Sequence, residues 1–253
     1  MKPNERQLKI TDIIRREGHV TVDELAATFK SSPETIRRDL SILALTGKVQ
    51  KIHGGAKSST LQGEGAFQQR MSQNVAAKRT IAESASKLIS SGDTLLINAG
   101  SSTVIFAEEL TKISNLTIVT SSLDIAKIMG ANKNGTKVFL LGGEYSRDNQ
   151  QTLGVSAISQ LKQYHVQHVI LPIGCINASV GFTDYDASDV ALAQAMISHA
   201  ENSIVLADSS KFNHTAPFVL GELDQIDRLV TEALPDNALL NALQESGVEL
   251  ICS

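Results

Sequence analysis

The sequence predicts a two-domain α/β protein, in which a small, mostly helical N-terminal domain precedes a larger domain with a mostly parallel sheet. Helical patterns separated by short turns fill the first 57 residues, and a small, polar, glycine-containing segment follows them. Beyond it, continuous apolar runs alternate with amphipathic helical patterns. Such alternation is typical of parallel strands covered by helices on both faces of the sheet. We expect a small domain at 1–57, a linker and connecting segment at 58–74, and the α/β domain at 75–253.

The composition is that of an ordinary globular chain. Of its 253 residues, 42% are hydrophobic and 20% are charged, which is enough apolar material for a sizeable core. The two cysteines, Cys175 and Cys252, do not have the spacing of a metal site or a disulfide framework. The first residues form no continuous apolar stretch, and no apolar run reaches the roughly 18 residues of a membrane helix. These features predict reduced thiols, no membrane segment and a cytoplasmic location.

The charges are distributed unevenly along the chain. Residues 1–57 contain eleven Lys and Arg against seven Asp and Glu, a net charge of +4 (11 − 7). The whole chain has a net charge of −4, so the remainder has −8. A basic segment on an acidic body favours contact of that segment with a polyanion such as nucleic acid. Chance is the alternative, because a segment of this size and charge is common in globular proteins, and the residue pattern has to decide.

Three helices are predicted in the first domain. Apolar residues recur at helical spacing over 4–17, and a short edge strand at 19–22 leads into a second helix over 22–30. Thr21 and Glu24 have the spacing of a capping box at the start of that helix. Ser32 as N-cap and Pro33 at the first helical position start a third helix at once, which ends near residue 46. Only a tight turn therefore separates the second helix from the third.

The third helix has one apolar and one basic face. Ile36, Leu40 and Leu43 form a core stripe opposite the polar and basic residues. A helix about 20 Å long fits a DNA major groove, with its first residues nearest the base edges. The segment 48–56 then alternates basic or polar with apolar residues before a double glycine, which predicts a β-wing. The candidate DNA-binding residues are Ser31, Ser32, Pro33, Glu34, Thr35, Arg37, Arg38, Ser41, Lys48, Lys51, His53 and Gly54.

Each of these charges alone is better explained as a solvated surface, but three compact helices, a capped tight turn and a basic wing together are specific. Arg37 and Arg38 point about 100° apart, so we assign at least one of them to phosphate. The run Thr35-Ile36-Arg37-Arg38-Asp39-Leu40, followed by Gly47 and by His53-Gly54-Gly55-Ala56, closely resembles the signature of DeoR-type transcription regulators. The resemblance implies a winged helix-turn-helix repressor, usually of sugar or polyol catabolism. Ser31 stands where such regulators usually carry Val, a departure that affects which operator sequence is recognised rather than DNA binding itself.

In the larger domain, polar and small residues follow successive predicted strands. The strands are expected at 94–98, 116–120, 138–141, 169–173, 203–207, 228–230 and 248–251, with helices such as 75–89 and 189–199 between them. Ligands bind beyond the carboxyl ends of such strands. The first strand runs into Gly100-Ser101-Ser102-Thr103 at a helix start, where free backbone donors and hydroxyls suit a phosphate. Ordinary βα-turn chemistry explains the polar residues at any one of these strand ends. It explains less well why such residues recur at successive strand ends along one edge of the sheet.

This half resembles the DeoR-type sensor domain, a Rossmann-like α/β fold similar to ribose-5-phosphate isomerase and the coenzyme A transferases, over about residues 70–211. The resemblance implies that Gly100, Ser101, Ser102 and Thr103 hold a sugar phosphate, that Thr120 and Ser121 line it and that Lys211 supplies a charge. Three positions depart from the family: Asn98 replaces an Asp, Ser121 an Asn, and Gln194 a basic residue. The candidate effector-binding residues are Asn98, Gly100, Ser101, Ser102, Thr103, Thr120, Ser121, Gly142, Gly143, Asp208 and Lys211.

The rival class is a sugar-phosphate isomerase-like enzyme fused to a DNA-binding head. Proton transfer beside a carbonyl needs a positioned base, and the first strand end offers only the neutral Asn98. Asp184, Asp186 and Asp208 have no acid/base pair spacing, and the six histidines show neither triad nor metal spacing. A non-specific DNA binder is disfavoured because the acidic body would repel DNA.

We therefore predict a non-enzymatic transcription regulator, which represses a sugar or polyol catabolic operon under the control of a phosphorylated sugar. Its expected partners are a double-stranded DNA operator, a phosphorylated sugar or polyol effector and further copies of itself in a homo-oligomer. No cofactor, metal or membrane is expected. The segment 142–151 contains two glycines and is the element that we expect to close over the sugar.

Overall fold

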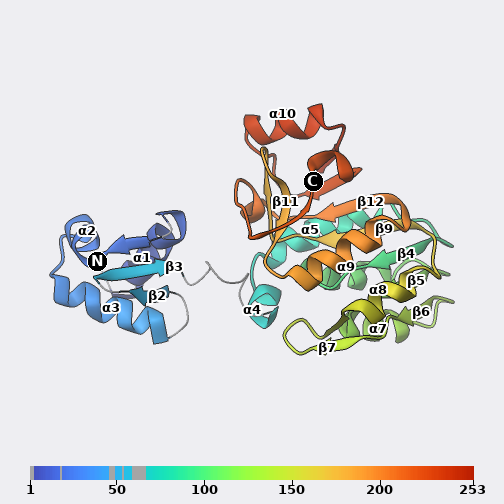
Figure 1. The fold of residues 1–253 in the computed structure, drawn as a ribbon, viewed down its shortest axis with the longest axis horizontal. Coiled ribbons are helices and arrows are strands. Elements are labelled where there is room, and N and C mark those ends of the chain that lie inside the picture. The colour runs from blue at the N-terminus through green and yellow to red at the C-terminus, as the bar shows by residue number, and fades with distance from the viewer. Residues whose placement is uncertain (1–2, 18, 46–48, 53, 59–66) are drawn as a thin grey trace. The chain divides into compact units, whose positions relative to one another are not determined.

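The computed structural model describes residues 3–17, 19–45, 49–52, 54–58 and 67–253 (Figure 1). The chain divides into two compact units, which meet in the sequence after Gly65. The first unit is called the head below, and the second the sensor unit.

The head consists of three helices and a three-stranded antiparallel sheet. Its elements, in chain order, are α1 (Pro3–Glu17), β1 (His19–Thr21), α2 (Val22–Phe29), α3 (Pro33–Leu45), β2 (Val49–Ile52) and β3 (Gly55–Ser58). The strand order is β1-β3-β2. The Thr21–Glu24 capping box is present, with Glu24 N donating to Thr21 Oγ1 at 3.2 Å and Thr21 N donating to Glu24 Oε2 at 2.7 Å. The predicted three helices and wing are thus confirmed.

Two contacts hold the helices and the wing of the head together. Asp39 on α3 is 3% exposed and accepts hydrogen bonds from Arg6 Nε at 2.6 Å and Gln7 Nε2 at 2.9 Å, so it ties α1 to α3. A Cβ at Gly55 would lie 2.3 Å from the carbonyl oxygen of Val20, so the pairing of β1 with β3 requires glycine there. Together with the buried apolar stripe of α3, these contacts fix the face that α3 turns outward.

The sensor unit is built on a seven-stranded parallel sheet in the order β15-β14-β12-β9-β4-β5-β6 (Figure 1). The strands are β4 (Thr94–Ile97), β5 (Thr117–Thr120), β6 (Lys137–Leu140), β9 (Val166–Pro172), β12 (Ala200–Leu206), β14 (Arg228–Thr231) and β15 (Glu249–Cys252). Every neighbouring pair in this sheet is parallel, which confirms the predicted fold class. From β4 the chain adds strands on one side and then, from β9, on the other. The carboxyl ends of β4 and β9 therefore flank the topological switch point, where open α/β sheets bind ligands.

Helices cover both faces of the sheet and explain its continuous apolar strands. They are α4 (Phe67–Ser72), α5 (Val75–Ser86), α6 (Ser101–Leu110), α7 (Leu123–Gly130), α8 (Val155–Leu161), α9 (Ala187–Ile197) and α10 (Asn237–Glu245). Leu95 and Ile97 of β4 pack into one core cluster with residues of α5, α6 and α7, whereas Leu96 packs into another with residues of α8, α9 and α10. Because side chains alternate along a strand, both faces of β4 need apolar residues.

The structure differs from the sequence prediction in three places. Helix α4 lies within 58–74, predicted as a linker and connecting segment, and its Phe67 is 2% exposed in the core of the sensor unit, so α4 belongs to that unit. The segment 142–151 is not a plain loop, because it contains β7 (Glu144–Ser146) and the first residue of β8 (Gln151–Leu153), which pair as an antiparallel hairpin. A small antiparallel sheet of β10 (Cys175–Asn177), β11 (Gly181–Asp184) and β13 (Phe218–Gly221) was not predicted. None of the helices in the described ranges is long and apolar enough to cross a membrane.

Candidate functional site

The outward face of α3 carries the predicted DNA-binding side chains. Ser32 caps the helix, with Thr35 N donating to its Oγ at 3.3 Å. Arg37 is 57% exposed and pairs with the still more exposed Glu34 at 3.0 Å between Nη1 and Oε2, while Arg38 is exposed beside it. Pro33 is exposed at the first position of the helix. Exposed ion pairs of this kind contribute little to stability, so Arg37 can exchange Glu34 for a phosphate or a base at small cost.

The wing adds a cation to the same face. Lys51 on β2 donates from Nζ to Ser41 Oγ at 3.1 Å, and Ser41 Oγ in turn donates to the carbonyl oxygen of Arg37 at 2.7 Å. The wing strand and the middle of α3 therefore present basic groups side by side. Gly54 forms the turn of the wing with a φ of 80°, whereas Lys48 and His53 lie outside the described residues. Ser31 precedes the helix and donates from Oγ to the carbonyl oxygen of Phe29 at 3.2 Å.

The predicted phosphate loop lies at the switch point of the sensor sheet. It joins β4 to α6, with Gly100 as the N-cap residue, and no side chain among the described residues caps the first amides of α6. Ser101 and Ser102 in that first turn are each 7% exposed. A Cβ at Gly100 would lie 2.5 Å from Pro172 Cγ of β9, so the helix start is pressed against the neighbouring strand. The loop thus offers uncapped backbone donors and two serine hydroxyls at one narrow place.

Replacement of Gly100 by alanine tests this close approach. We expect Gly100→Ala to lower the free energy of unfolding by about 1 to 3 kcal/mol, because the added methyl overpacks against Pro172. Gly130→Ala in α7 is the matched control, since nothing lies within 4 Å of its Cβ position. Chemical denaturation of both variants measures the effect. A Gly100→Ala protein as stable as Gly130→Ala would contradict the packing described here.

Three other residues predicted for this site fix its backbone. Thr103 is fully buried and donates from Oγ1 to the carbonyl oxygen of Asn98 at 2.7 Å. Thr120 is fully buried and donates from Oγ1 to the carbonyl oxygen of Ile97 at 2.7 Å, which ties the ends of β4 and β5 together. Asn98 accepts from Ala99 N through Oδ1 at 2.9 Å. These side chains hold the shape of the loop, while Ser101 and Ser102 lie in the first turn of α6.

The remaining predicted residues lie at the ends of β6 and β12. Gly142 is exposed, and its N–H donates to Gln160 Oε1 at 3.1 Å. Gly143 is exposed and abuts Leu153, whose carbonyl oxygen would lie 2.4 Å from an added Cβ. Asp208 is 2% exposed and accepts from Asn74 Nδ2 at 2.9 Å, and Lys211 follows it in a short 3₁₀ turn. Because β9 lies between them, β12, which precedes Lys211, and β4, which precedes the phosphate loop, are two strand spacings apart, about 9.5 Å.

Sequence reasoning missed a buried polar cluster beside this loop. Gln151, at the start of β8, is fully buried and donates from Nε2 to Asp189 Oδ1 at 2.5 Å. Asn149 donates from Nδ2 to Asp189 Oδ2 at 3.3 Å and accepts from Arg70 Nη2 at 2.5 Å. Gln151 Oε1 and Ser121 Oγ are buried without a hydrogen-bond partner in the part of the chain that the structure describes. Gln151, Asn149, Asp189 and Arg70 come from three separate segments, so no sequence motif marks them.

The environment of Asp189 makes the stability of the protein depend on pH. Burial, together with Asp186 and Asp184, raises its pKa to about 7, while Gln151 and Arg70 act in the opposite direction. Between about pH 4 and pH 7 the folded protein therefore holds a proton that the unfolded chain has lost, and stability falls as pH rises through this window. Above pH 7 the penalty is constant.

Asp189→Asn removes this titration. We expect the free energy of unfolding of the variant, relative to the parent, to rise by a few kcal/mol, on the order of 1.4 for each unit of pKa shift, between pH 4 and pH 7. Urea denaturation at about pH 4.5 and 7.5 measures it. A difference that stays constant with pH would contradict the raised pKa.

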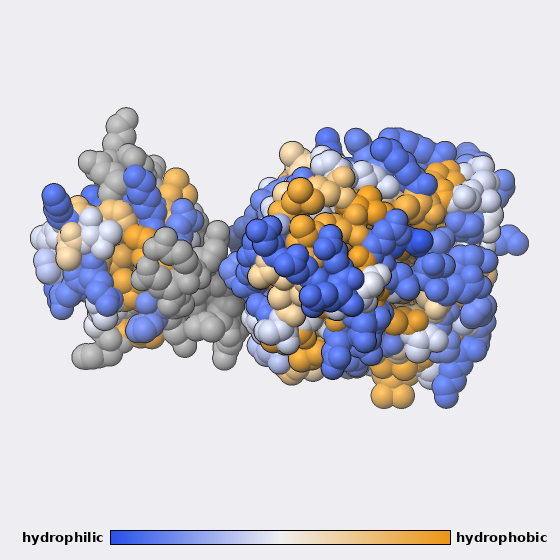
Figure 2. Space-filling model, turned by 90° about the horizontal axis from the view of Figure 1, so that it is seen from above, coloured by the Kyte–Doolittle hydropathy of each residue, from blue (hydrophilic) through white to orange (hydrophobic). Residues whose placement is uncertain are grey.

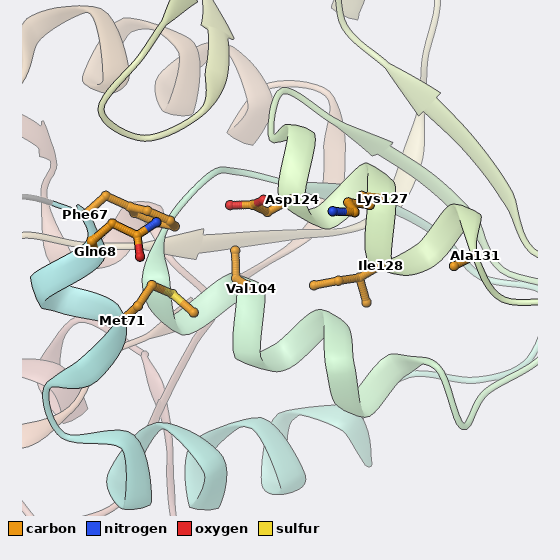
Figure 3. Close-up of a pocket in the computed structure, with 8 residues that line it drawn as sticks. All are labelled: Phe67, Gln68, Met71, Val104, Asp124, Lys127, Ile128 and Ala131. Atoms are coloured by element: carbon orange, nitrogen blue, oxygen red, sulfur yellow. The ribbon is translucent and has the colours of Figure 1, made fainter.

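A separate apolar groove of about 460 Å³ lies between α4, α6 and α7 (Figure 3). Phe67 and Met71 of α4 face Val104 of α6 and Ile128 of α7 across it, with Asp124 and Lys127 at its rim. It contains none of the predicted effector-binding residues. Among the described residues, no group of three or more His, Cys, Asp and Glu side chains could hold a metal ion.

Comparison with known protein families decides the class. The DeoR-like helix-turn-helix domain matches residues 6–62, and the DeoR C terminal sensor domain matches residues 73–233. The chain belongs to the DeoR family. This confirms the resemblance drawn from the α3 motif, and the two matched regions correspond to the head and to most of the sensor unit.

Two relatives that align over nearly the whole chain are named as repressors. The chain is 30% identical to the HTH-type transcriptional repressor CsqR of Escherichia coli strain K12, over 98% of this chain and 95% of that protein. It is 31% identical to the glycerol-3-phosphate regulon repressor of Haemophilus influenzae, over 99% of this chain and 97% of the relative. Among solved structures, ribose 5-phosphate isomerase A of Methanocaldococcus jannaschii has 15% identity and a TM-score of 0.41, over 55% of each chain.

Proposed function

We propose that this protein represses a sugar or polyol catabolic operon by binding operator DNA through α3 and the wing, under the control of a phosphorylated sugar bound by the sensor unit. The observation that carries the proposal is the uncapped start of α6 at the switch point of the sheet. Backbone N–H groups, the helix dipole and the hydroxyls of Ser101 and Ser102 together favour a dianion. Relatives named as glycerol-3-phosphate regulon repressors support a phosphorylated ligand.

The polar cluster suggests how ligand binding reaches the DNA-binding side of the chain. Asn149 and Gln151 belong to the hairpin segment that we expect to contact the sugar, and Asn149 accepts from Arg70 of α4. Arg70 also lies over the ring of Phe67, 5.5 Å from its centroid. Helix α4 is the first element after the segment that joins the sensor unit to the head. A ligand that moves the hairpin therefore acts on the helix nearest to the head in sequence. The ligand controls DNA binding only to the extent that its affinities for the DNA-binding state and the other state of the protein differ.

An isomerase-like enzyme is the less supported alternative. Asp189 has the raised pKa of a candidate base, but both its carboxylate oxygens already accept hydrogen bonds from amides. Asp208 is tied to Asn74 and Ser210, and the end of β4 offers the neutral Asn98. Two relatives that align over nearly the whole chain, CsqR and the Haemophilus influenzae glycerol-3-phosphate regulon repressor, are named as repressors. We therefore assign the sensor unit to binding and not to turnover.

The proposal is tested with the full chain and a panel of probes. The probes are glycerol 3-phosphate, ribose 5-phosphate, fructose 6-phosphate and glucose 6-phosphate, each with its unphosphorylated counterpart. We expect at least one phosphorylated probe to raise the melting temperature without being consumed and to change the affinity for operator DNA by roughly 5- to 150-fold. Selection from random duplex DNA supplies the operator. Turnover of a probe, or equal binding of the phosphorylated and free sugar, would contradict the proposal.

We also propose that the protein acts as a homodimer or larger oligomer on repeated half-sites. One short recognition helix reads too few bases to be selective alone. The sensor unit has exposed apolar side chains, Phe139, Leu140, Tyr145 and Val155, and Figure 2 shows apolar areas between hydrophilic ones on one of its faces. Sedimentation equilibrium is expected to give at least a dimer. A monomer that binds one isolated half-site tightly and selectively would contradict this expectation.

A further inference from the structure

The Gln151 side chain is oriented by a chain of hydrogen bonds that begins at a donor of fixed polarity. Arg70 has only N–H donors, so the atom of Asn149 that it contacts is the oxygen, and the Asn149 amide nitrogen faces Asp189. An ionised Asp189 can only accept hydrogen bonds, so its other carboxylate oxygen accepts one from Gln151 Nε2. Gln151 Oε1 is therefore presented away from Asp189 as an acceptor.

Backbone pairing brings the segments that carry Gln151 and Ser121 together at the end of β5, the strand beside β4. Ser121 follows β5, whose Thr120 pairs with Ile97 at the end of β4. Ser121 is two residues after Val119, which packs in the core cluster that contains α9, so its side chain turns to the same face of the sheet as Asp189. The Ser121 carbonyl oxygen accepts from Thr152 N at 2.9 Å, and Ser122 forms a bridge with Gln151. The two segments are thus joined directly.

Both polar atoms are fully buried and lack hydrogen-bond partners among the described residues, although a buried unsatisfied group costs about 1 to 3 kcal/mol. A ligand hydroxyl satisfies both requirements, because it donates to Gln151 Oε1 and a hydroxyl oxygen accepts from Ser121 Oγ. A ligand carboxylate does not, because it cannot donate and would stand close to Asp189. The cluster therefore selects a hydroxyl-bearing carbon chain over a carboxylate or a bare phosphate.

We propose that Gln151 and Ser121 form a hydroxyl-recognition subsite next to the phosphate loop, and that Asp189 is a positioning residue that fixes the orientation of the Gln151 amide. The inference rests on the proposed function, since it assigns the part of the effector beyond its phosphate. It predicts that discrimination among phosphorylated compounds depends on a ligand hydroxyl within reach of Gln151 and Ser121.

The test compares sugar phosphates with inorganic phosphate by calorimetry on the full chain at about pH 8, where Asp189 is ionised. The probes are inorganic phosphate, glycerol 3-phosphate, ribose 5-phosphate, 2-deoxyribose 5-phosphate, fructose 6-phosphate and glucose 6-phosphate. For the parent protein we expect at least one sugar phosphate to bind tenfold or more tightly than inorganic phosphate. We expect Gln151→Met to lose that gain while its affinity for inorganic phosphate stays within about twofold.

Two further variants and a control make the result specific. Ser121→Ala removes one buried atom that has no partner in the described structure, so it keeps the fold and is expected to lose part of the same gain. Asp189→Asn places an amide, which can donate as well as accept, beside Gln151, so the Gln151 amide can rotate by 180°. We expect this variant to lose the discrimination between sugar phosphate and inorganic phosphate. A merely structural role of Asp189 would not change this discrimination selectively. Gln163→Met, at an exposed position after α8, is the control and keeps the parent affinities.

The outcomes distinguish failure of the hydroxyl-recognition subsite from failure of the proposed function. Unchanged discrimination in both Gln151→Met and Ser121→Ala, or no sugar phosphate that exceeds inorganic phosphate, overturns the subsite but leaves a phosphate sensor. Failure of the parent protein to bind any of the six probes overturns the proposed function itself, and the subsite with it.

Discussion

Ser102→Glu is expected to abolish the response of DNA binding to the effector while leaving DNA binding without effector intact. Ser102 is the second residue of α6 and is 7% exposed, so a carboxylate there occupies the place of the phosphate. It takes the free amides of the helix start and repels a dianion. Since charge-assisted hydrogen bonds contribute about 1.5 to 3 kcal/mol each, we expect the Kd for the effector to rise at least a hundredfold.

Ser156→Glu is the matched control for this variant. Ser156 is also the second residue of a helix with a glycine N-cap, α8, but it is exposed and outside the predicted site. It receives the same charge in the same helical position, so the control should respond to effector like the parent. Circular dichroism and thermal unfolding verify the fold of both variants. A Ser102→Glu protein that responds normally, in a gel-shift titration with effector, would show that the phosphate binds elsewhere.

The head was predicted almost residue by residue because its signals are local. The Thr21–Glu24 box, Ser32 before Pro33, and the glycines of the wing each act within a few residues of the element that they start or end. The predicted helix over 22–30 ends at Phe29, with Lys30 as a left-handed cap. Such capping does not depend on the rest of the chain, so sequence alone specifies it.

The sheet of the sensor unit was predictable in strand positions but not in strand order. Apolar runs mark each strand, whereas the order β12-β9-β4-β5 depends on how helices pack on the two faces. The polar loops at the strand ends could be predicted as a group, because parallel strands bring their carboxyl ends to one edge. Their individual roles could not. The sequence does not reveal that Thr103 and Thr120 donate to backbone carbonyls.

The Gln151–Asp189 cluster lay beyond sequence reasoning for a physical reason. Gln151 lies on the hairpin, Asp189 in the first turn of α9 and Arg70 on α4, and their contacts arise only when these three elements pack together. In the sequence each residue reads as an ordinary surface polar group. Burial turns them into a set of mutually oriented partners and raises the pKa of Asp189.

Removal of the two arginines of α3 is expected to have the largest effect on DNA affinity. Arg37 and Arg38 are exposed on the outward face of the helix, and Lys51 reaches the same face through Ser41. We expect Arg37→Ala or Arg38→Ala to weaken operator binding by about 1 to 3 kcal/mol where the residue reads a base, and the double variant to lose specific binding. Where one arginine contacts phosphate, its loss instead reduces the slope of log affinity against log salt concentration by about one.

The control for the arginine pair carries the same loss of charge on the other unit. Arg79→Ala with Lys162→Ala removes two exposed cations from α5 and the end of α8, both in the sensor unit. Net charge falls equally in both double variants, so a general electrostatic effect would weaken both equally. We expect footprints of the Arg79/Lys162 variant to match the parent and those of the Arg37/Arg38 variant to vanish at the parent's working concentration. Full protection of the operator with both arginines of α3 removed would mean that another face of the head reads the DNA.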